Sequence, residues 1–247
     1  NDESVVMFGS DDGNLYAANA KSGVLSWKYK TGGAIRSSPA VSKYGNIVVF
    51  GSDDQHVHCV SVNTGEEKWK YATGSMVRSS PALTAAVYVG SGFGDNALHS
   101  LDLSSGRLRW KFQTKGGVNS SPVVSGDLGT VFFGSNDNSL YAVSTSTGEL
   151  LWEYKTGSDV RASPSFSTDG SVLYVGSNDG VLHGVNAASG GAQFNFDTGQ
   201  AIFASPAVSN DGSCLFFGSG TTLYATCNSL LTQFSSRQIP DAVKIGL

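Results

Sequence analysis

The sequence predicts an all-β fold, a β-propeller of four-stranded antiparallel blades, because three kinds of marker residue recur about every 42 residues. The first marker is a Gly-Ser pair, and successive pairs are 42, 39, 44, 42 and 42 residues apart. The second is a proline, and the third is a large aromatic residue. The pairs start at Gly9, Gly51, Gly90, Gly134, Gly176 and Gly218, and the prolines are Pro39, Pro81, Pro122, Pro164 and Pro206. Short strand patterns fill each repeat, so each unit should bury its faces against two neighbours.

Each repeat is expected to form four strands, as residues 118–154 illustrate. Runs of apolar and β-branched residues predict strands at Val118–Ser125, Thr130–Gly134, Leu140–Ser144 and Leu150–Tyr154. Turn residues separate these runs, in the sequences GDLG, SNDNS and TSTGE. The middle strands are apolar without alternation, which indicates that both of their faces are buried.

The aromatic marker ends the fourth strand and follows a Ser/Thr-Gly pair by four residues in the first four repeats. An indole combines a large apolar ring with one N–H donor, so a tryptophan at a fixed place suits docking on the next blade with a backbone carbonyl as acceptor. We interpret the aromatic residues of this series as structural. They are Trp27, Trp69, Trp110, Trp152 and Phe194.

Composition limits the classes of function. The repeat runs from Val5 to Tyr224 without a linker, so a single propeller domain at 1–247 is expected. The net charge is −4, which argues against nucleic acid as a partner, because a phosphate backbone requires clustered Lys and Arg. No apolar run reaches the roughly 18 residues that a membrane span needs.

The two ends of the chain predict how the ring closes. Val5–Gly9 matches the second strand of a blade and has no first strand before it. The tail at Arg237–Val243 resembles Arg36–Val41, with Arg three residues before Pro in both. We expect the tail to pair beside Val5–Gly9 and to close six blades, which removes exposed strand edges. A piece of a seven- or eight-bladed ring is the alternative, because the sixth repeat lacks the tryptophan motif after Ala225.

Two stretches carry a family resemblance. GSNDNSLYAVSTSTGELLW and GSDDGNLYAANAKSGVLSW resemble the tryptophan-docking repeat of pyrroloquinoline-quinone-type propellers, and the resemblance covers nearly the whole chain. That family contains quinoprotein dehydrogenases and non-catalytic relatives, among them the outer-membrane assembly propeller lipoprotein and propellers fused to receptors and kinases. The resemblance implies the fold, whereas the repeat itself is a packing device and leaves function open.

The position three residues before each proline is the main candidate for binding. In a propeller the first strand lines the central channel, so these residues are expected in a ring at one mouth. Guanidinium groups bind carboxylate or phosphate, which favours an anion or an acidic protein or peptide partner there. The alternative is that each arginine pairs with an aspartate of a neighbouring hairpin, such as Asp11, Asp53, Asp137 or Asp179. The candidate residues are Arg36, Arg78, Asn119, Arg161 and Arg237, with Phe203 at the remaining position.

No metal site is predicted. The Asp- and Asn-rich hairpins lack the distal bidentate Glu of a calcium loop and fit turns that need positive φ. His58, His99 and His183 stand where other repeats have tyrosine, as at Tyr16 and Tyr141. Because they belong to different blades, we expect them to be core or interface residues rather than ligands.

The cysteines allow a disulfide. Pairing Gly218 with Leu223 in the last hairpin places Cys214 directly opposite Cys227. They form either a disulfide or two reduced, packed thiols. A disulfide would indicate an oxidising compartment, either periplasmic or secretory.

These observations predict a non-catalytic propeller without a cofactor that binds or scaffolds a protein or peptide through its channel mouth and hairpin rim. Quinoprotein dehydrogenases of the resembling family carry adjacent cysteines and a calcium-bound quinone. This chain has no adjacent cysteines and no long inserted loops that could hold an acid/base pair. Two alternatives stay open. One is a fragment or reduced form of a PQQ-dependent dehydrogenase, with PQQ and calcium, and the other is the sensor domain of a receptor or kinase.

Overall fold

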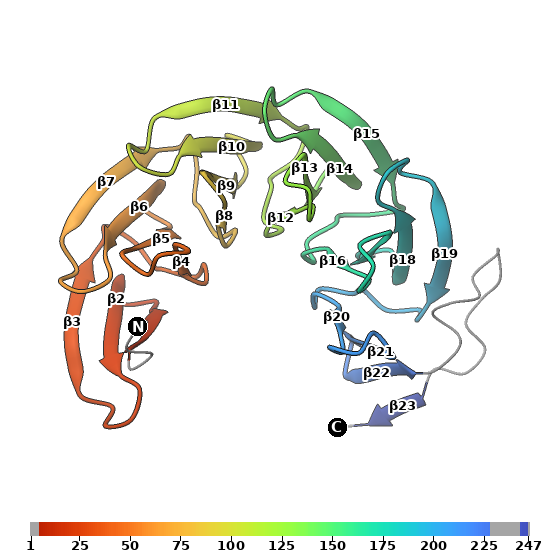
Figure 1. Cartoon of the computed structure of the whole chain (residues 1–247). Helices are drawn as coiled ribbons and strands as arrows, with labels where there is room; N and C mark the ends of the chain where they lie inside the picture. Colours follow the sequence, from red (N-terminus) through yellow and green to blue (C-terminus); the bar gives the residue numbers. More distant parts are fainter. Residues whose placement is uncertain (1–4, 228–242, 247) are drawn as a thin grey trace. The chain divides into compact units, whose positions relative to one another are not determined.

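The computed structural model describes residues 5–227 and 243–246, and every regular element in them is a β-strand. The chain divides into two compact units, Asn1–Pro122 and Val123–Leu247, which we describe one at a time. Each unit contains three antiparallel sheets (Figure 1). The expected single domain at 1–247 therefore stays a prediction. Among the described residues, no helix is long and apolar enough to cross a membrane.

The first unit contains one three-stranded sheet and two four-stranded sheets, each with its strands in chain order. The first sheet is β1 (Val5–Gly9), β2 (Asn14–Asn19) and β3 (Leu25–Lys30). The second is β4 (Ala40–Val41), β5 (Ile47–Gly51), β6 (His56–Ser61) and β7 (Glu67–Ala72). The third is β8 (Ala82–Leu83), β9 (Ala86–Ser91), β10 (Ala97–Asp102) and β11 (Leu108–Gln113).

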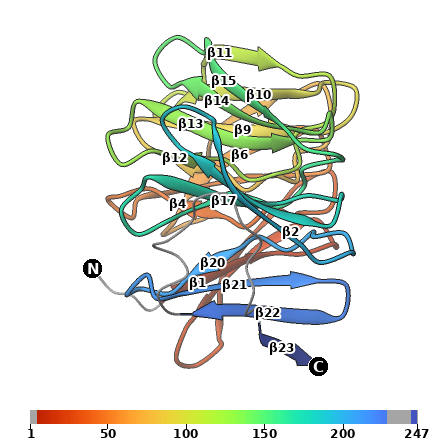
Figure 2. The same ribbon diagram turned by 90° about the vertical axis from the view of Figure 1, so that its right-hand side faces the viewer.

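The second unit contains three four-stranded sheets, also in chain order. The fourth sheet is β12 (Val123–Val124), β13 (Thr130–Ser135), β14 (Ser139–Ser144) and β15 (Leu150–Lys155). The fifth is β16 (Ser165–Phe166), β17 (Val172–Gly176), β18 (Val181–Asn186) and β19 (Ala192–Asp197). The sixth is β20 (Ala207–Val208), β21 (Cys214–Ser219), β22 (Thr222–Cys227) and β23 (Val243–Gly246), with β23 at its edge (Figure 2).

The first strand of each four-stranded sheet is shorter than the sequence predicts. The expected strand Val118–Ser125 is wrong in length, because only Val123–Val124 pairs in the ladder. Pro122 has no N–H to donate. In the equivalent part of the second sheet, a serine side chain takes over the pairing, since Ser37 Oγ donates to Gly51 O at 2.9 Å and accepts from Gly51 N at 2.8 Å.

The structure differs from the predicted closing strand in the part of the tail that it describes. Arg237 and the rest of 228–242 lie outside the described residues. Val243 is described, and it pairs with Ala225 of β22, so the tail strand β23 completes the sixth sheet instead of lying beside Val5–Gly9. The physical reason is that the sequence after Ala225 lacks the tryptophan motif of a fourth strand, and β23 supplies partners for the backbone groups along the edge of β22.

The glycine of the Gly-Ser marker ends a strand, and a loop packs closely against it. A Cβ on Gly51 would overlap the side chain and carbonyl of Val77, and one on Gly9 would overlap Ile35 in the same way. Val77 and Ile35 are buried residues of the loop that leads to the next sheet. The glycine at the end of β1 or β5 therefore leaves room for the loop that follows the last strand of the same sheet. This close contact fixes where the next residue of the loop emerges.

Each docked indole sits on the glycine of the next sheet's last turn. Trp27 Nε1 donates to Val62 O at 2.9 Å, and a Cβ on Gly65 would lie 2.7 Å from the Trp27 ring. Two further tryptophans repeat this arrangement. Phe194 has the aromatic position in the fifth sheet, where its ring carries no N–H donor and is buried in the cluster that contains Leu215 of β21. The other pairs are Trp69 with Leu103 O at 3.0 Å over Gly106, and Trp152 with Ala187 O at 3.1 Å over Gly190.

Replacing Gly106 by alanine should destabilise the protein more than replacing Gly45. Both glycines have positive φ, +68° and +67°, so both variants bear the left-handed strain of about 1 kcal/mol. A Cβ at Gly106 would also lie 2.6 Å from Trp69, whereas one at Gly45 would meet nothing within 4 Å. We expect Gly106→Ala to cost about 2 kcal/mol more than Gly45→Ala in urea unfolding. Equal costs would contradict the docking role of the indole.

Candidate functional site

The candidate arginines of the first unit emerge from loops that are held between two hairpin turns. In the loop between β3 and β4, Ile35 N donates to Ser10 O at 3.0 Å, and Ala34 O accepts from Asp53 N at 2.8 Å. One bond fixes the loop to the turn of the first sheet and the other to the turn of the second. Arg36 consequently emerges between two acidic turns.

Two arginines and two aspartates alternate along this edge of the first unit. Arg36 Nε donates to Asp11 Oδ1 at 2.8 Å, and its Nη1 lies 3.7 Å from Asp53 Oδ2. Arg78 binds Asp53 through two bonds, Nε to Oδ1 at 2.9 Å and Nη2 to Oδ2 at 3.0 Å. Asp11 is 72% exposed and Asp53 is 14% exposed, so the pairs differ in their access to solvent.

These contacts stabilise the charged forms. The hydrogen bond and charge of Arg36 hold the pKa of Asp11 below its usual value, and the bond to Asp11 raises the pKa of Arg36. The hydrogen bond to Asp53 raises the pKa of Arg78. Asp11, Arg36 and Arg78 are therefore ionised near neutral pH, and the row contains two arginines and two aspartates, so that its formal charges balance. Of the two arrangements that the sequence allowed, the structure places Arg36 and Arg78 in pairs with hairpin aspartates.

Apolar side chains lie beside Arg78. Phe93 is 62% exposed and Met76 is 38% exposed. Gly92 N donates to Met76 O at 2.9 Å and Ser75 Oγ donates to Phe93 O at 2.6 Å, so the two backbones run together. Arg78 Nη2 also lies 3.3 Å from Met76 Sδ. We call Asp11, Arg36, Asp53, Arg78, Met76 and Phe93 the loop surface. Asn119, the third candidate of this unit, is half-buried beside Gly92.

The second unit has a different arrangement. Arg161 Nη2 donates to Asp159 Oδ2 at 2.9 Å, a carboxylate of its own loop, rather than to Asp137 or Asp179 as the sequence suggested. Asn136 occupies the place that Asp11 has in the first unit and carries no charge to attract the arginine. Phe203 takes the equivalent position in the next loop and is exposed. Arg237 lies outside the described residues.

The three histidines connect consecutive sheets. Each lies four residues after an aspartate in the preceding turn, and its Nε2 faces that carboxylate while its Nδ1 faces a tyrosine hydroxyl from the last strand of the previous sheet. Because a carboxylate only accepts, Nε2 carries the proton. The triplets are Asp54–His58–Tyr29 at 3.1 and 3.2 Å, Asp95–His99–Tyr71 at 2.6 and 3.3 Å, and Asp179–His183–Tyr154 at 3.2 and 3.0 Å.

The sequence reading missed these triplets, although it expected buried histidines. The available signal was the spacing, since Tyr16 bonds Asp12 at 2.6 Å and Tyr141 bonds Asp137 at 2.9 Å across the same four residues. Histidine and tyrosine therefore perform the same task at this position, which is to bind the turn aspartate.

Beside the second triplet, Ser91 joins Asp95 and His99, but these three residues lack the geometry of an activated nucleophile. Ser91 Oγ donates to Asp95 Oδ2 at 2.5 Å, and His99 Nε2 faces the same carboxylate. A catalytic serine donates to a histidine whose other nitrogen holds the aspartate, and here both groups address Asp95. Burial alone would raise the pKa of Asp95, but hydrogen bonds from His99, Lys111 and Ser91 together hold it far below its usual range. The cluster is a structural ion pair network.

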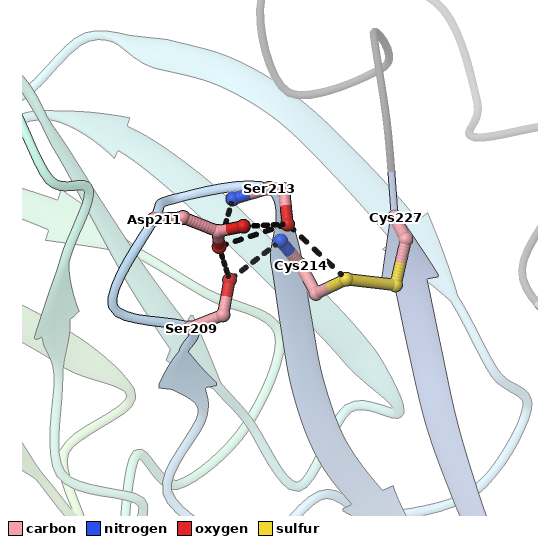
Figure 3. The surroundings of a disulfide bond; sticks show 5 residues. All are labelled: Ser209, Asp211, Ser213, Cys214 and Cys227. Atoms are coloured by element: carbon pink, nitrogen blue, oxygen red, sulfur yellow. Dashed lines mark hydrogen bonds between the residues drawn. A yellow bond between two sulfur atoms is a disulfide. The ribbon is translucent and has the colours of Figure 1, made fainter.

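The cysteines form one bridge and one buried thiol. Cys214 and Cys227 lie opposite each other in the register of β21 and β22, the register that the sequence predicted, and are joined by a disulfide (Figure 3). The turn that enters β21 is held beside it, where Cys214 N donates to Ser209 Oγ at 2.9 Å. Burial raises the pKa of the Cys59 thiol to about 12, so this thiol stays protonated. Within the described residues, no group of three His, Cys, Asp or Glu could hold a metal ion.

A family model described as outer membrane protein assembly factor BamB matches residues 1–95 and 84–229. The crystal structure of BamB from Moraxella catarrhalis superposes with a TM-score of 0.76 at 20% identity, covering 91% of this chain and 67% of that one. A search of curated proteins gives no match. These findings establish an all-β propeller with PQQ-like repeats, in which the six sheets are the blades.

Replacing His58 by tyrosine should reduce the pH dependence of stability. Burial lowers the pKa of His58 in the folded protein, although Asp54 opposes the shift. Below about pH 6.5 the unfolded chain therefore binds more protons than the folded one, and stability falls as the pH falls. A tyrosine can bind Asp54 as Tyr16 binds Asp12, and it does not titrate there.

Urea midpoints measured from about pH 7 to about pH 5 should fall less for His58→Tyr than for the wild type. His56, on the same strand but more exposed, is the matched control, and His56→Gln should change the slope of the urea midpoint against pH less than His58→Tyr does, because burial is the main cause of the lowered pKa of His58 and the charge of His56 is a smaller one. A slope unchanged by His58→Tyr would show that the buried imidazole does not control this dependence.

Replacing Cys227 by serine should lower the free energy of unfolding by about 3 kcal/mol, because the bridge closes a loop with a sequence separation of 13. Dithiothreitol should lower the melting temperature of the wild type and leave that of Cys227→Ser unchanged. Cys59→Ala is the control, and this variant should keep its sensitivity to the reductant. A wild type that is insensitive to reduction would contradict a stabilising bridge.

Proposed function

The chain belongs to the family described as outer membrane protein assembly factor BamB, and from this premise we propose that it is a non-catalytic propeller that binds protein partners in outer-membrane protein assembly. We place the contact with these partners at the loop surface. The process is inferred from the family, and the mode of binding is inferred from the residues of this chain.

The observation that carries the proposal is that Phe93 and Met76 are both exposed on adjacent backbone segments and that Arg78 contacts Met76. Aromatic residues, methionine and arginine are enriched in protein interfaces, where an aromatic anchor flanked by polar contacts supplies most of the binding energy. The repeat does not need an exposed phenylalanine for its own packing, because the docked indoles and the buried middle strands already fill the core.

The charged row beside this apolar pair can exchange partners at little cost. The Arg36–Asp11 pair is well exposed, and exposed ion pairs contribute roughly 0 to 1 kcal/mol. An acidic segment of a partner can therefore displace Asp11 from Arg36 while Asp53 keeps Arg78 in place. In this way the row accepts a carboxylate although its own charges balance. We extend the proposal to Asn119 in the same unit and, as separate contacts, to Arg161 and Arg237.

The disulfide supports an oxidising compartment such as the periplasm, because bridges of this kind persist there and are rare in the cytosol. This agrees with a role in outer-membrane assembly. The quinoprotein and receptor alternatives stay predictions, and no contact among the described residues favours either.

The test replaces Phe93 and Arg78 by alanine, singly and together, in cells that depend on this protein. Co-purified envelope proteins are quantified by mass spectrometry after mild cross-linking, and folded outer-membrane proteins are measured in parallel. We expect the double variant to lose at least about tenfold of its principal partner, the equivalent of about 1.4 kcal/mol. Phe93→Ala should leave the urea midpoint nearly unchanged because Phe93 is exposed, and the midpoint of Arg78→Ala, which removes two hydrogen bonds from Asp53, is measured to confirm that this variant is folded.

Tyr44→Ala is the matched control, because Tyr44 is an exposed aromatic residue of the same unit in the turn between β4 and β5, at the other end of β5. It should retain the partner. If a triple replacement of Arg36, Arg78 and Arg161, and the Phe93 variant, all retain every partner, the loop surface is not the binding site and the proposal fails.

A further inference from the structure

The two arginines of the loop surface reach the same carboxylate oxygen. Arg36 Nη1 lies 3.7 Å from Asp53 Oδ2, and Arg78 Nη2 donates to this oxygen at 3.0 Å. The two guanidinium groups are therefore neighbours, and both are within reach of Asp53. The Asp53 side chain is only 14% exposed, whereas those of Arg36 and Arg78 are 46% and 39% exposed. The two cations are thus more open to a ligand than the anion that they share.

Each guanidinium group keeps N–H donors that no protein acceptor uses. Arg36 donates through Nε to Asp11, and Arg78 donates through Nε and Nη2 to Asp53. Within residues 5–227 and 243–246, Arg36 Nη2 and Arg78 Nη1 contact no acceptor. Guanidinium donors bind carboxylates in a fixed, planar geometry. A carboxylate of a partner can therefore bind these donors while Asp53 holds Arg78 in place.

The apolar part of the loop surface comes from a lengthened turn. Counted from the serine of the Gly-Ser marker to the aspartate that faces the histidine, the turn between β9 and β10 is two residues longer than the turn between β5 and β6. Phe93 lies in this insertion, with a glycine on each side. Because Gly92 N donates to Met76 O at 2.9 Å, the insertion is fixed to the loop that carries Arg78. Arg78 Nη2 lies 3.3 Å from Met76 Sδ, so the apolar side chains begin where the guanidinium group ends.

This arrangement sets a place for a carboxylate directly beside a place for an apolar side chain. In an extended segment, consecutive side chains point to opposite sides, and side chains two residues apart are separated by roughly 7 Å. An acidic side chain and an apolar side chain of such a segment therefore fit this short spacing poorly. A C-terminal residue, in contrast, carries its carboxylate and its side chain on the same Cα. A chain end with an apolar last residue fits the spacing between Arg78 and Met76 best.

We propose that the loop surface binds the free C-terminus of a partner polypeptide. The terminal carboxylate binds Arg36 and Arg78, and the last side chain, which is apolar, packs against Met76 and Phe93. This inference rests on the proposed function, because it takes the loop surface as the place of contact. It narrows the partner from an acidic segment to a chain end, which a binding site can recognise because each chain has one free α-carboxylate.

The test measures the binding of short peptides, labelled at their N-terminus, to the purified, disulfide-bonded chain by fluorescence anisotropy. The probe is Ser-Gly-Ser-Gly-Leu with a free carboxylate, and its matched control is the same peptide as a C-terminal amide. A third peptide, Ser-Gly-Glu-Gly-Leu amide, restores the negative charge two residues before the leucine. We expect the free acid to bind at least about tenfold more tightly than either amide.

Two variants separate the two halves of the site. Arg36→Gln should bring the affinity for the free acid close to that for the amide, because it removes donors to the carboxylate. Phe93→Ala should weaken the acid and the amide by the same factor, because both peptides share the apolar contact. Lys43→Gln is the matched control for charge, since Lys43 is an exposed cation in the turn between β4 and β5, and this variant should keep the preference for the acid. All three variants should keep a urea midpoint close to that of the wild type, because the side chains are well exposed.

The inference is overturned if the free acid does not bind, or if the acid and the amide bind equally. It is also overturned if Ser-Gly-Glu-Gly-Leu amide binds as tightly as the free acid, since the arginines would then bind an internal acidic side chain, or if Arg36→Gln keeps the preference for the acid. The proposed function fails on a different measurement, the retention of envelope partners by the loop-surface variants in cells, so that the two failures can be told apart.

Discussion

The contact on which each unit depends is an indole ring lying on a left-handed glycine of the next sheet. It requires three things at once, namely a tryptophan at a fixed place in the fourth strand, a glycine whose missing Cβ leaves room for the ring, and a carbonyl that accepts the indole N–H. Gly65, Val62 and Trp27 meet these requirements together. Since the three parts come from two consecutive repeats, a change in spacing would separate them, and this explains why the repeat keeps close to one period.

A polar contact accompanies the apolar one. Where the indole joins the outer strand to the last turn, the tyrosine two residues later reaches the histidine of the next sheet, and that histidine holds the aspartate of the hairpin turn. Asp54 accepts in addition from Gly32 N at 3.0 Å, a group of the preceding loop. Buried side chains thus hold these hairpin turns in place, and the outward-facing side chains of the turns are not needed for packing. Phe93 can differ from its counterparts for this reason.

Sequence alone was sufficient wherever one repeat could be compared with another. The four-strand pattern, the role of Trp27 and the register that sets Cys214 opposite Cys227 all follow from the period. It was insufficient where a contact is unique to one repeat or depends on side chains competing for hydrogen bonds. Arg161 binds its own loop at Asp159 because Asn136 carries no charge, and the first strands are short because serine side chains and Pro122 interrupt the ladder. The tail was misplaced because its resemblance to Arg36–Val41 is local, whereas an unpaired edge on β22 decides where it pairs.

The first sheet shows how packing and the loop surface are connected. In the turn between β1 and β2, Asp12 is held by Tyr16 and by Asn14 N at 2.9 Å, both from its own sheet. Its counterpart Asp54 has a further bond from the preceding loop, and Asp53 beside it is correspondingly buried and bound twice by Arg78. Asp11, beside Asp12, is the most exposed carboxylate of the row and has one arginine partner. A turn that is supported from only one sheet thus carries the most exchangeable ion pair of the loop surface.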